Sequence, residues 1–197
     1  FGVAGIALFD AVWGMQKTAP WPNRAVRIGV VAVCALLAGN LVYQTRYELG
    51  LPKAYTYFDK AGKLLPEIPI PGGSGKVKPV FPNGKTAAEF EYVDGKLIGD
   101  NLTYHPNGKL QFSSREDYSL TEGKLSNFYA SGQLQSEYTY LHNSLHGPYH
   151  EYNGKGVLTE EGNYYNGLLH GVMKMYDDTG KLKETRRYYY GILQEIK

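Results

Sequence analysis

The sequence has a single cysteine, Cys34, among its 197 residues. A disulfide within the chain is therefore impossible, and the cysteine count does not report the redox compartment. An excess of one charge is also missing: 21 Lys and Arg stand against 19 Asp and Glu, for a formal net charge of +2 at pH 7. This near-neutral charge gives no reason to expect nucleic-acid binding, and no pattern of a single-strand-binding module is present.

Catalytic signatures are absent from the sequence as well. It contains no Gly-x-Ser-x-Gly elbow, phosphate loop, dinucleotide fingerprint or Cys-x-x-Cys. The acidic pairs at 160–161 and 177–178 each border a turn, where solvation is expected rather than glycosidase chemistry. His142, His146 and His150 are four residues apart, but this spacing aligns metal ligands on a helix and not on the strand–turn–strand predicted here. We expect no enzyme activity, cofactor, metal or small-molecule substrate.

The sequence does contain a period of 24 residues, which runs from about residue 75 to the C-terminus. Two glycine positions, an aromatic position and a leucine position recur in one register. Such a period indicates stacked supersecondary units, each of which completes its core only against its neighbours. The four ladders are Gly84, Gly108, Gly132, Gly156 and Gly180; Gly99, Gly123, Gly147 and Gly171; Tyr104, Phe128, Tyr152 and Tyr176; and Leu110, Leu134, Leu158 and Leu182.

Each unit carries two turn signals that alternate with short runs rich in Tyr, Phe, Val and Thr. The first turn holds a ladder glycine, as in Asn83-Gly84, and the second follows eleven residues later, as at Gly95 and Asn143. Glycine and asparagine accept the positive φ of tight hairpins, and the runs have the length of strands. We predict a mainly β fold, an elongated antiparallel β-meander over residues 80–197. An aromatic column, broken by Glu116, supports it: Tyr92, Tyr140, Tyr164 and Tyr188.

These units resemble MORN repeats (membrane occupation and recognition nexus), most closely the bacterial variant often labelled as a toxin–antitoxin-type antitoxin. The segments that carry the resemblance are 104–110, 166–171 and 176–182, and it covers roughly residues 80 to 193, with a possible degenerate unit at 57–65. The resemblance implies an extended β-meander used for protein or lipid contact, with no catalytic residues. The unit at 111–126 departs from the pattern, and a bulged or frayed strand is expected there.

The first 16 residues are mostly apolar, with Asp10 as the only charge. Three interpretations stay open for this segment: the end of a first transmembrane helix, an interfacial helix, or a helix buried against a partner. A cleaved signal peptide is not expected, because no basic n-region is present. Together with the basic loop that follows, the segment forms a first unit over residues 1–24.

A second apolar stretch, residues 25–43, is long enough to cross a bilayer, since 19 residues of helix span about 28 Å. We predict a transmembrane helix, with a juxtamembrane extension, over residues 25–51, ended by Pro52; a buried core helix is the alternative. Small residues at helical spacing permit another helix to approach closely. They are Ala32, Ala35, Ala38 and Gly39.

Basic residues set the expected orientation of this helix. Lys17, Arg24 and Arg27 precede it with no acid between them, whereas Glu48 lies between Arg46 and Lys53 after it. The positive-inside rule then places the 17–27 segment inside and the repeats outside. We predict a single- or two-pass protein, of a bacterial inner membrane, with a periplasmic repeat domain. Residues 52–79, rich in proline and glycine, are predicted to be a linker.

Tyrosine provides the best candidate surface for a partner, because it joins a large apolar face to a polar tip. We expect one tyrosine column to form the core and part of another to be exposed. A basic pair near the last strand could meet an anionic headgroup or an acidic partner, although charges at strand edges also prevent aggregation. The predicted partner-binding residues are Tyr152, Tyr164, Tyr176, Tyr188, Tyr189, Arg186 and Arg187.

The function predicted from these features is that of a non-catalytic, membrane-anchored accessory or scaffolding subunit of a larger membrane protein complex. Its expected partners are membrane protein subunits and the lipid bilayer, without nucleic acid. Two alternatives stay open: a free-standing antitoxin or immunity-like binder, and an envelope protein that binds lipid or glycan.

Overall fold

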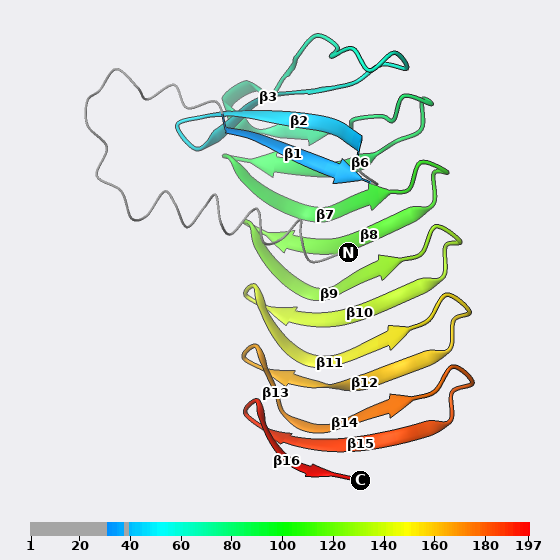
Figure 1. Cartoon of the computed structure of the whole chain (residues 1–197). Coiled ribbons are helices and arrows are strands. Elements are labelled where there is room, and N and C mark those ends of the chain that lie inside the picture. The colour runs from blue at the N-terminus through cyan, green and yellow to red at the C-terminus, as the bar shows by residue number, and fades with distance from the viewer. Residues whose placement is uncertain (1–30, 38–39) are drawn as a thin grey trace.

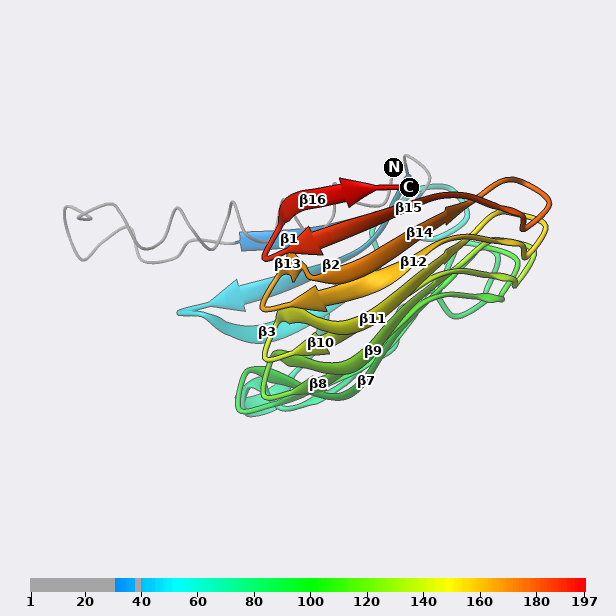
Figure 2. The same cartoon turned by 90° about the horizontal axis from the view of Figure 1, so that it is seen from below.

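The 24-residue period folds as a ladder of hairpins in a computed structural model that describes residues 31–37 and 40–197 (Figure 1). Successive strands pair antiparallel in one large sheet, ordered β5 to β12, then β14 to β16, with the short β13 beside β12. Figure 2 shows these strands stacked behind one another in a single curved layer. Their bounds are β5 Gly75–Val77, β6 Ala88–Val93, β7 Lys96–Tyr104, β8 Leu110–Asp117, β9 Leu120–Phe128, β10 Leu134–Leu141, β11 Ser144–Tyr152, β12 Leu158–Tyr165, β13 Leu168–Leu169, β14 Gly171–Tyr176, β15 Leu182–Tyr189 and β16 Ile192–Ile196. The predicted meander is confirmed.

The first turn signal forms a five-residue loop at one edge of the sheet. In the β7–β8 loop, Gly108 N donates to His105 O at 2.7 Å, and His105 N donates to Lys109 O at 2.8 Å. Gly108 has a φ of 85°, which explains the glycine at this position. The first loops of the series are also tied to one another, since Asn83 Nδ2 donates to Pro106 O and Asn107 Nδ2 donates to Ala130 O, each at 2.7 Å. The same loop occurs at Asp59–Lys63, within the possible degenerate unit at 57–65.

The second turn signal forms two-residue hairpins at the opposite edge. Both central residues have positive φ, as at Asn166 (49°) and Gly167 (80°), which is the geometry of a type I′ turn. These turns are also joined from repeat to repeat, because Gly167 N donates to Leu145 O at 2.8 Å. The two series of turns therefore lie on the two long edges of one sheet, as the sequence predicts.

The second glycine ladder marks a repeated break in the strand pairing and not a turn. Tyr138 of β10 pairs with Tyr149 of β11, and Tyr140 pairs with Leu145. Strand β11 therefore has a longer stretch between the two pairs than β10 has. Gly147 lies in the extra length of β11, with a φ of 110°. Extra residues in one strand make a bulge that bends and twists the sheet. Strand β8, for which a bulge or fraying is expected, is continuous from Leu110 to Asp117, and its pairing with β9 shifts register near Ser114, as a bulge does.

Alternate residues of each strand point to opposite sides of the large sheet. We call the side that carries Tyr92, Tyr140, Tyr164 and Tyr188 the tyrosine face, and the other side the second face. A smaller antiparallel sheet packs on the tyrosine face at its N-terminal end (Figure 1). This smaller sheet contains β1 Val31–Leu37, β2 Asn40–Glu48, β3 Leu51–Tyr57 and β4 Ile68–Pro69.

The core of the molecule lies where these two sheets meet. Tyr55, Ile70, Val77 and Tyr92 form a buried cluster, with Tyr47 packed against it. The Tyr47 and Tyr92 rings meet edge to face, with centroids 6.4 Å apart and planes at 89°. This geometry is favourable for aromatic pairs. The smaller sheet thus gives the first repeat strands a second layer.

The predicted helix over residues 25–51 is wrong in the part that the structure describes, where β1 and β2 form a hairpin. Leu49 and Gly50 have φ of 51° and 80°, so the chain reverses in a two-residue turn that no helix can include. The β-branched and aromatic residues of this segment also favour strands. Ala32 and Ala35 of the predicted helix-packing surface lie in β1, opposite Arg46 and Tyr43; Ala38, Gly39 and residues 1–30 lie outside the described residues. No helix in 31–37 and 40–197 is long and apolar enough to cross a bilayer.

The predicted linker at 52–79 is also wrong, because this segment builds the core. Pro52, Ile70, Val77 and Pro79 are each at most 2 % exposed. Their apolar side chains fill the space between the sheets, and β3, β4 and β5 all lie within the segment. Proline and glycine are here used for packing and for a 3₁₀ turn at Pro71–Gly73, rather than for a spacer.

Candidate partner-binding surface

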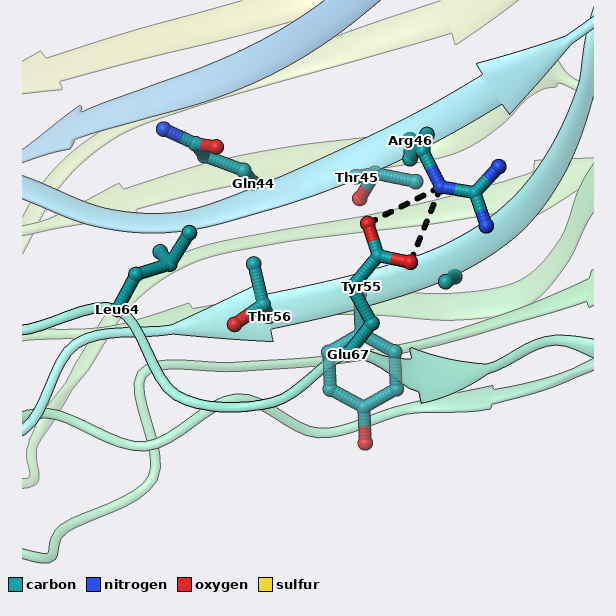
Figure 3. A pocket seen from close by; sticks show the side chains of 8 residues that line it. Gln44, Thr45, Arg46, Tyr55, Thr56, Leu64 and Glu67 are labelled. Carbon is teal, nitrogen blue, oxygen red and sulfur yellow. Dashed lines mark hydrogen bonds and ion pairs between the residues drawn. The ribbon is translucent and has the colours of Figure 1, made fainter.

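An open hollow of about 300 Å³ lies on the second face, between β11, β12 and β14, with His150, Glu161 and Lys174 among its lining residues. One small cavity, of about 70 Å³, lies between β2, β3 and the loop that precedes β4 (Figure 3). Arg46 Nε donates to both carboxylate oxygens of Glu67, at 3.0 and 3.1 Å, and Thr56 Oγ1 donates to Leu65 O at 2.6 Å. The polar groups at this cavity bond to one another, and the space holds little more than water.

The tyrosine face carries a row of ordered rings across the middle repeats. Tyr138 stacks on Tyr149, with centroids 5.5 Å apart and an interplanar angle of 4°, and Tyr149 contacts Tyr164 at 5.0 Å. Tyr149 is 1 % exposed and donates its hydroxyl to Glu160 at 2.7 Å. Burial, followed by this hydrogen bond to a carboxylate, raises the pKa of Tyr149. These rings are fixed by their neighbours and form a firm surface.

The column that contains Tyr92 is covered at one end only. Tyr47 of the smaller sheet lies on Tyr92, and its hydroxyl oxygen is 2.5 Å from that of Tyr92. Tyr140, Tyr164 and Tyr188 occupy the same position in later repeats and are half-buried. Their strands, β10, β12 and β15, lie beyond the smaller sheet (Figure 1). Glu116 replaces tyrosine in one repeat and is held by Ser114 Oγ at 2.8 Å and Thr121 Oγ1 at 3.3 Å. The position therefore accepts either residue.

The second face has a different chemistry, in which polar side chains bond to one another. Tyr176 donates its hydroxyl to Glu161 at 2.7 Å, and Lys174 Nζ lies 2.9 Å from the same carboxylate. The hydrogen bond from Tyr176, and then the one from Lys174, lower the pKa of Glu161. Tyr152 lies on this face too, beside His150, with ring centroids 6.5 Å apart. These groups satisfy one another within the sheet.

The structure does not bring the predicted partner-binding residues into one patch. Tyr164, Tyr188 and Arg186 lie on the tyrosine face, whereas Tyr152, Tyr176 and Arg187 lie on the second face. Each arginine is paired with a glutamate: Arg186 Nε contacts Glu184, and Arg187 Nε lies 3.8 Å from Glu195. Arg186 and Arg187 therefore form no shared basic patch, and Tyr189, 60 % exposed, lies beside a turn at the sheet edge.

Apart from Tyr189, the sequence reasoning missed a group of exposed apolar residues. They flank the two-residue turns of the C-terminal repeats, and we call them the turn-edge stripe. Its members are Leu141 (43 % exposed), Tyr165 (43 %), Leu168 (47 %), Tyr189 (60 %), Tyr190 (44 %) and Ile192 (65 %). The 24-residue spacing of Leu141, Tyr165 and Tyr189, and that of Leu168 and Ile192, are the signals that could have revealed it.

Comparison with known proteins agrees with this geometry. A family model described as a MORN repeat variant matches residues 97–114, 121–142 and 169–189. Each match includes strands of the large sheet and one or more of its turns. No curated protein matches the chain. The description of the matched family names no antitoxin. The predicted resemblance to MORN repeats is therefore confirmed for these three segments, in the variant form of the repeat.

Proposed function

We propose that this protein is a non-catalytic accessory or scaffolding subunit that binds another protein on the tyrosine face of its repeat sheet. The supporting observation is the Tyr92 column. At Tyr92 the chain itself packs a second layer on this face, through Tyr47. Tyr140, Tyr164 and Tyr188 continue the same column without that layer among the described residues. A partner that continues the layer would bury three more rings of the same kind.

The chemistry of the tyrosine face favours a protein over a small ligand. The rings are held in place before binding, which lowers the entropy cost of forming an interface. Glu151 and Glu160 accept hydrogen bonds from Tyr138 and Tyr149, and each carboxylate has further lone pairs that can accept from a partner's donors. Tyrosine rows with satisfied polar groups are typical of protein interfaces.

We further propose that the protein works at a membrane. Of the two apolar segments from which the sequence predicts this location, one supports the proposal. Strand β1 occupies Val31–Leu37, where a spanning helix over residues 25–43 is predicted, so the positive-inside rule has no helix to orient. The proposal therefore depends on the apolar character of residues 1–16, where Asp10 is the only charge, and it names no side of the membrane.

The test is extraction of the native membrane in mild detergent, followed by identification of the proteins that migrate with this chain. Tyr164→Glu with Tyr188→Glu should abolish the association, because two rings of the proposed interface are replaced by charges. The fold should tolerate the change, since Glu116 shows that the column accepts a carboxylate. The matched control is Tyr152→Glu with Tyr176→Glu on the second face, which should leave the association intact. Migration of the unmodified chain alone would overturn the proposal, and capture of a single toxin-like protein would favour the antitoxin alternative.

A further inference from the structure

The five-residue loops form the polar edge of the large sheet, where side chains such as Lys109 and Gln133 are exposed. Asn-Gly pairs occur in these loops and in one two-residue turn. In such a pair, the glycine nitrogen can attack the side-chain amide carbon of the asparagine, because glycine has no Cβ to hinder the approach. The pairs begin at Asn83, Asn107, Asn153 and Asn166.

Hydrogen bonds hold three of these four pairs. After Asn107, the glycine nitrogen donates to His105 O at 2.7 Å, and the side-chain amide of Asn107 donates to Ala130 O at 2.7 Å. The pair that begins at Asn83 has the equivalent bonds. After Asn166, the glycine nitrogen donates to the preceding hairpin at 2.8 Å. Each of these nitrogens has to give up a hydrogen bond before it can react.

The pair at Asn153 differs because of its place in the loop. Asn153 is the first residue of its loop, whereas Asn107 is the third. The nitrogen that closes each loop belongs to the fourth residue, here Gly156, which donates to Asn153 O at 2.8 Å. In the part of the chain that the structure describes, neither Gly154 N nor Asn153 Nδ2 has a hydrogen-bond partner. Gly154 is exposed, so water reaches the pair.

The side-chain oxygen of Asn153 is held by the loop. It accepts from Lys155 N at 3.0 Å and from Val157 N at 3.1 Å. When a nitrogen adds to the amide carbon, negative charge collects on this oxygen. Backbone N–H groups that are already directed at the oxygen stabilise that charge. The loop therefore leaves the attacking nitrogen free and activates the carbon that it attacks.

We propose that Asn153-Gly154 is a site of spontaneous deamidation in the folded protein, and that the other three Asn-Gly pairs are protected. Gly154 N gives its proton to a base in the solvent and forms a bond to Cγ of Asn153. The bond from Cγ to Nδ2 breaks, and Nδ2 takes up a proton and leaves as ammonia. Water then opens the five-membered imide, to aspartate or to isoaspartate, which has one more methylene in the main chain.

The aspartate product fits the loop, because aspartate already occupies this position in two other loops. Asp59 Oδ1 accepts from Ala61 N at 2.8 Å, and Asp177 Oδ1 accepts from Lys181 N at 3.0 Å. Deamidation to aspartate thus adds a negative charge to the polar edge and keeps the bonds of the loop. The reaction needs no partner and is independent of the function proposed above.

The experiment incubates the full chain at mildly alkaline pH, folded and unfolded in guanidinium chloride, and follows each pair by peptide mass and isoaspartate content. In the unfolded chain the four pairs should react at similar rates. In the folded chain Asn153 should react about tenfold or more faster than Asn107, because the two hydrogen bonds at Asn107 have to break first. Gly154→Ala should fold, since a Cβ there has nothing within 4 Å, and should slow the reaction.

A second variant transfers the reactive pair to another loop. Asp177→Asn with Asp178→Gly places it in the last five-residue loop, where the first residue accepts from two backbone N–H groups at 2.9 and 3.0 Å. This variant should deamidate at position 177 at a rate close to that of Asn153. Protection of Asn153 to the same degree as Asn107 would overturn the proposal, and so would an unreactive position 177 in the folded variant.

Discussion

The hydroxyl oxygens of Tyr47 and Tyr92 lie 2.5 Å apart, at the point where the smaller sheet meets the first strands of the repeat sheet. The two residues are 45 positions apart in the chain and belong to different sheets. Tyr92 is 6 % exposed, so this contact is the polar centre of an otherwise apolar interface. Tyr92 belongs to the 24-residue repeat, and its contact with Tyr47 shows the role of this repeat position when a second layer covers it.

Tyr47→Phe or Tyr92→Phe should each lower the free energy of unfolding by about 1–2 kcal/mol, because each leaves one buried hydroxyl without its partner. The double variant should cost no more than either single variant, since no orphaned hydroxyl then remains. Urea unfolding of the three variants measures this coupling. Simple addition of the two losses would show that the hydroxyls do not act as a pair.

Gly162→Ala should destabilise the protein by about 1–3 kcal/mol, through overpacking of a filled site. A Cβ at Gly162 would lie 2.8 Å from Cε1 of Tyr149, which is 1 % exposed and fixed by its bond to Glu160. Gly154→Ala is the control, because a Cβ there has nothing within 4 Å. Thermal unfolding of both variants is the measurement. Equal transition temperatures would contradict the tight packing of Tyr149.

Leu49→Asn should raise the free energy of unfolding by about 1 kcal/mol. Leu49 has a φ of 51° in the β2–β3 turn, which is unfavourable for leucine and tolerated by asparagine. Its side chain is 80 % exposed, so little packing is lost. Gly50→Ala, at a φ of 80°, should have the opposite sign. A destabilised Leu49→Asn variant in urea unfolding would argue against the type I′ turn.

Stability should fall as the pH rises above about 10. Burial raises the pKa of Tyr92 and Tyr149 above the usual 10.0, with added contributions from Tyr47 and Glu160 respectively. A group whose pKa is higher in the folded state stabilises fully below the unfolded pKa and loses that contribution as the pH passes through the folded pKa. Tyrosinate absorbance should show a late-titrating group that appears together with unfolding. If all 18 tyrosines titrate near pH 10 in the folded chain, the prediction fails.

The repeat domain could be read from the sequence because its signals are local. Gly108 and Gly167 each need a positive φ, and the alternation of such positions with short aromatic runs defines hairpins without any tertiary information. The MORN resemblance rests on the same turns. The sequence does not predict that Tyr164 and Tyr176 lie on opposite faces. The face on which a residue lies depends on strand alternation and on the bulge near the ladder glycines together.

The N-terminal region could not be read in this way, because an apolar run has no unique period. Residues 31–48 have the hydropathy of a buried helix or of a buried hairpin, and the Leu49-Gly50 turn lacks the asparagine that usually marks this geometry. The composition of residues 52–79 predicts a linker, because the residues that bury Ile70, such as Tyr92 of β6 and Leu97 of β7, are distant in sequence. Burial that is created by tertiary contact leaves little trace in local composition.

The links between successive turns have a consequence for how this protein can vary in length. Gly167 bonds to Leu145, and the same bond recurs at each two-residue turn of the large sheet, whereas bonds such as that from Asn107 to Ala130 join the first five-residue loops. Insertion or loss of one whole 24-residue unit keeps both series of bonds, and moves the C-terminal end by two strands, about 10 Å. Insertion of half a unit would exchange the apolar and polar edges downstream. Duplication can therefore lengthen the tyrosine column in discrete steps, while the smaller sheet at the N-terminal end stays as it is.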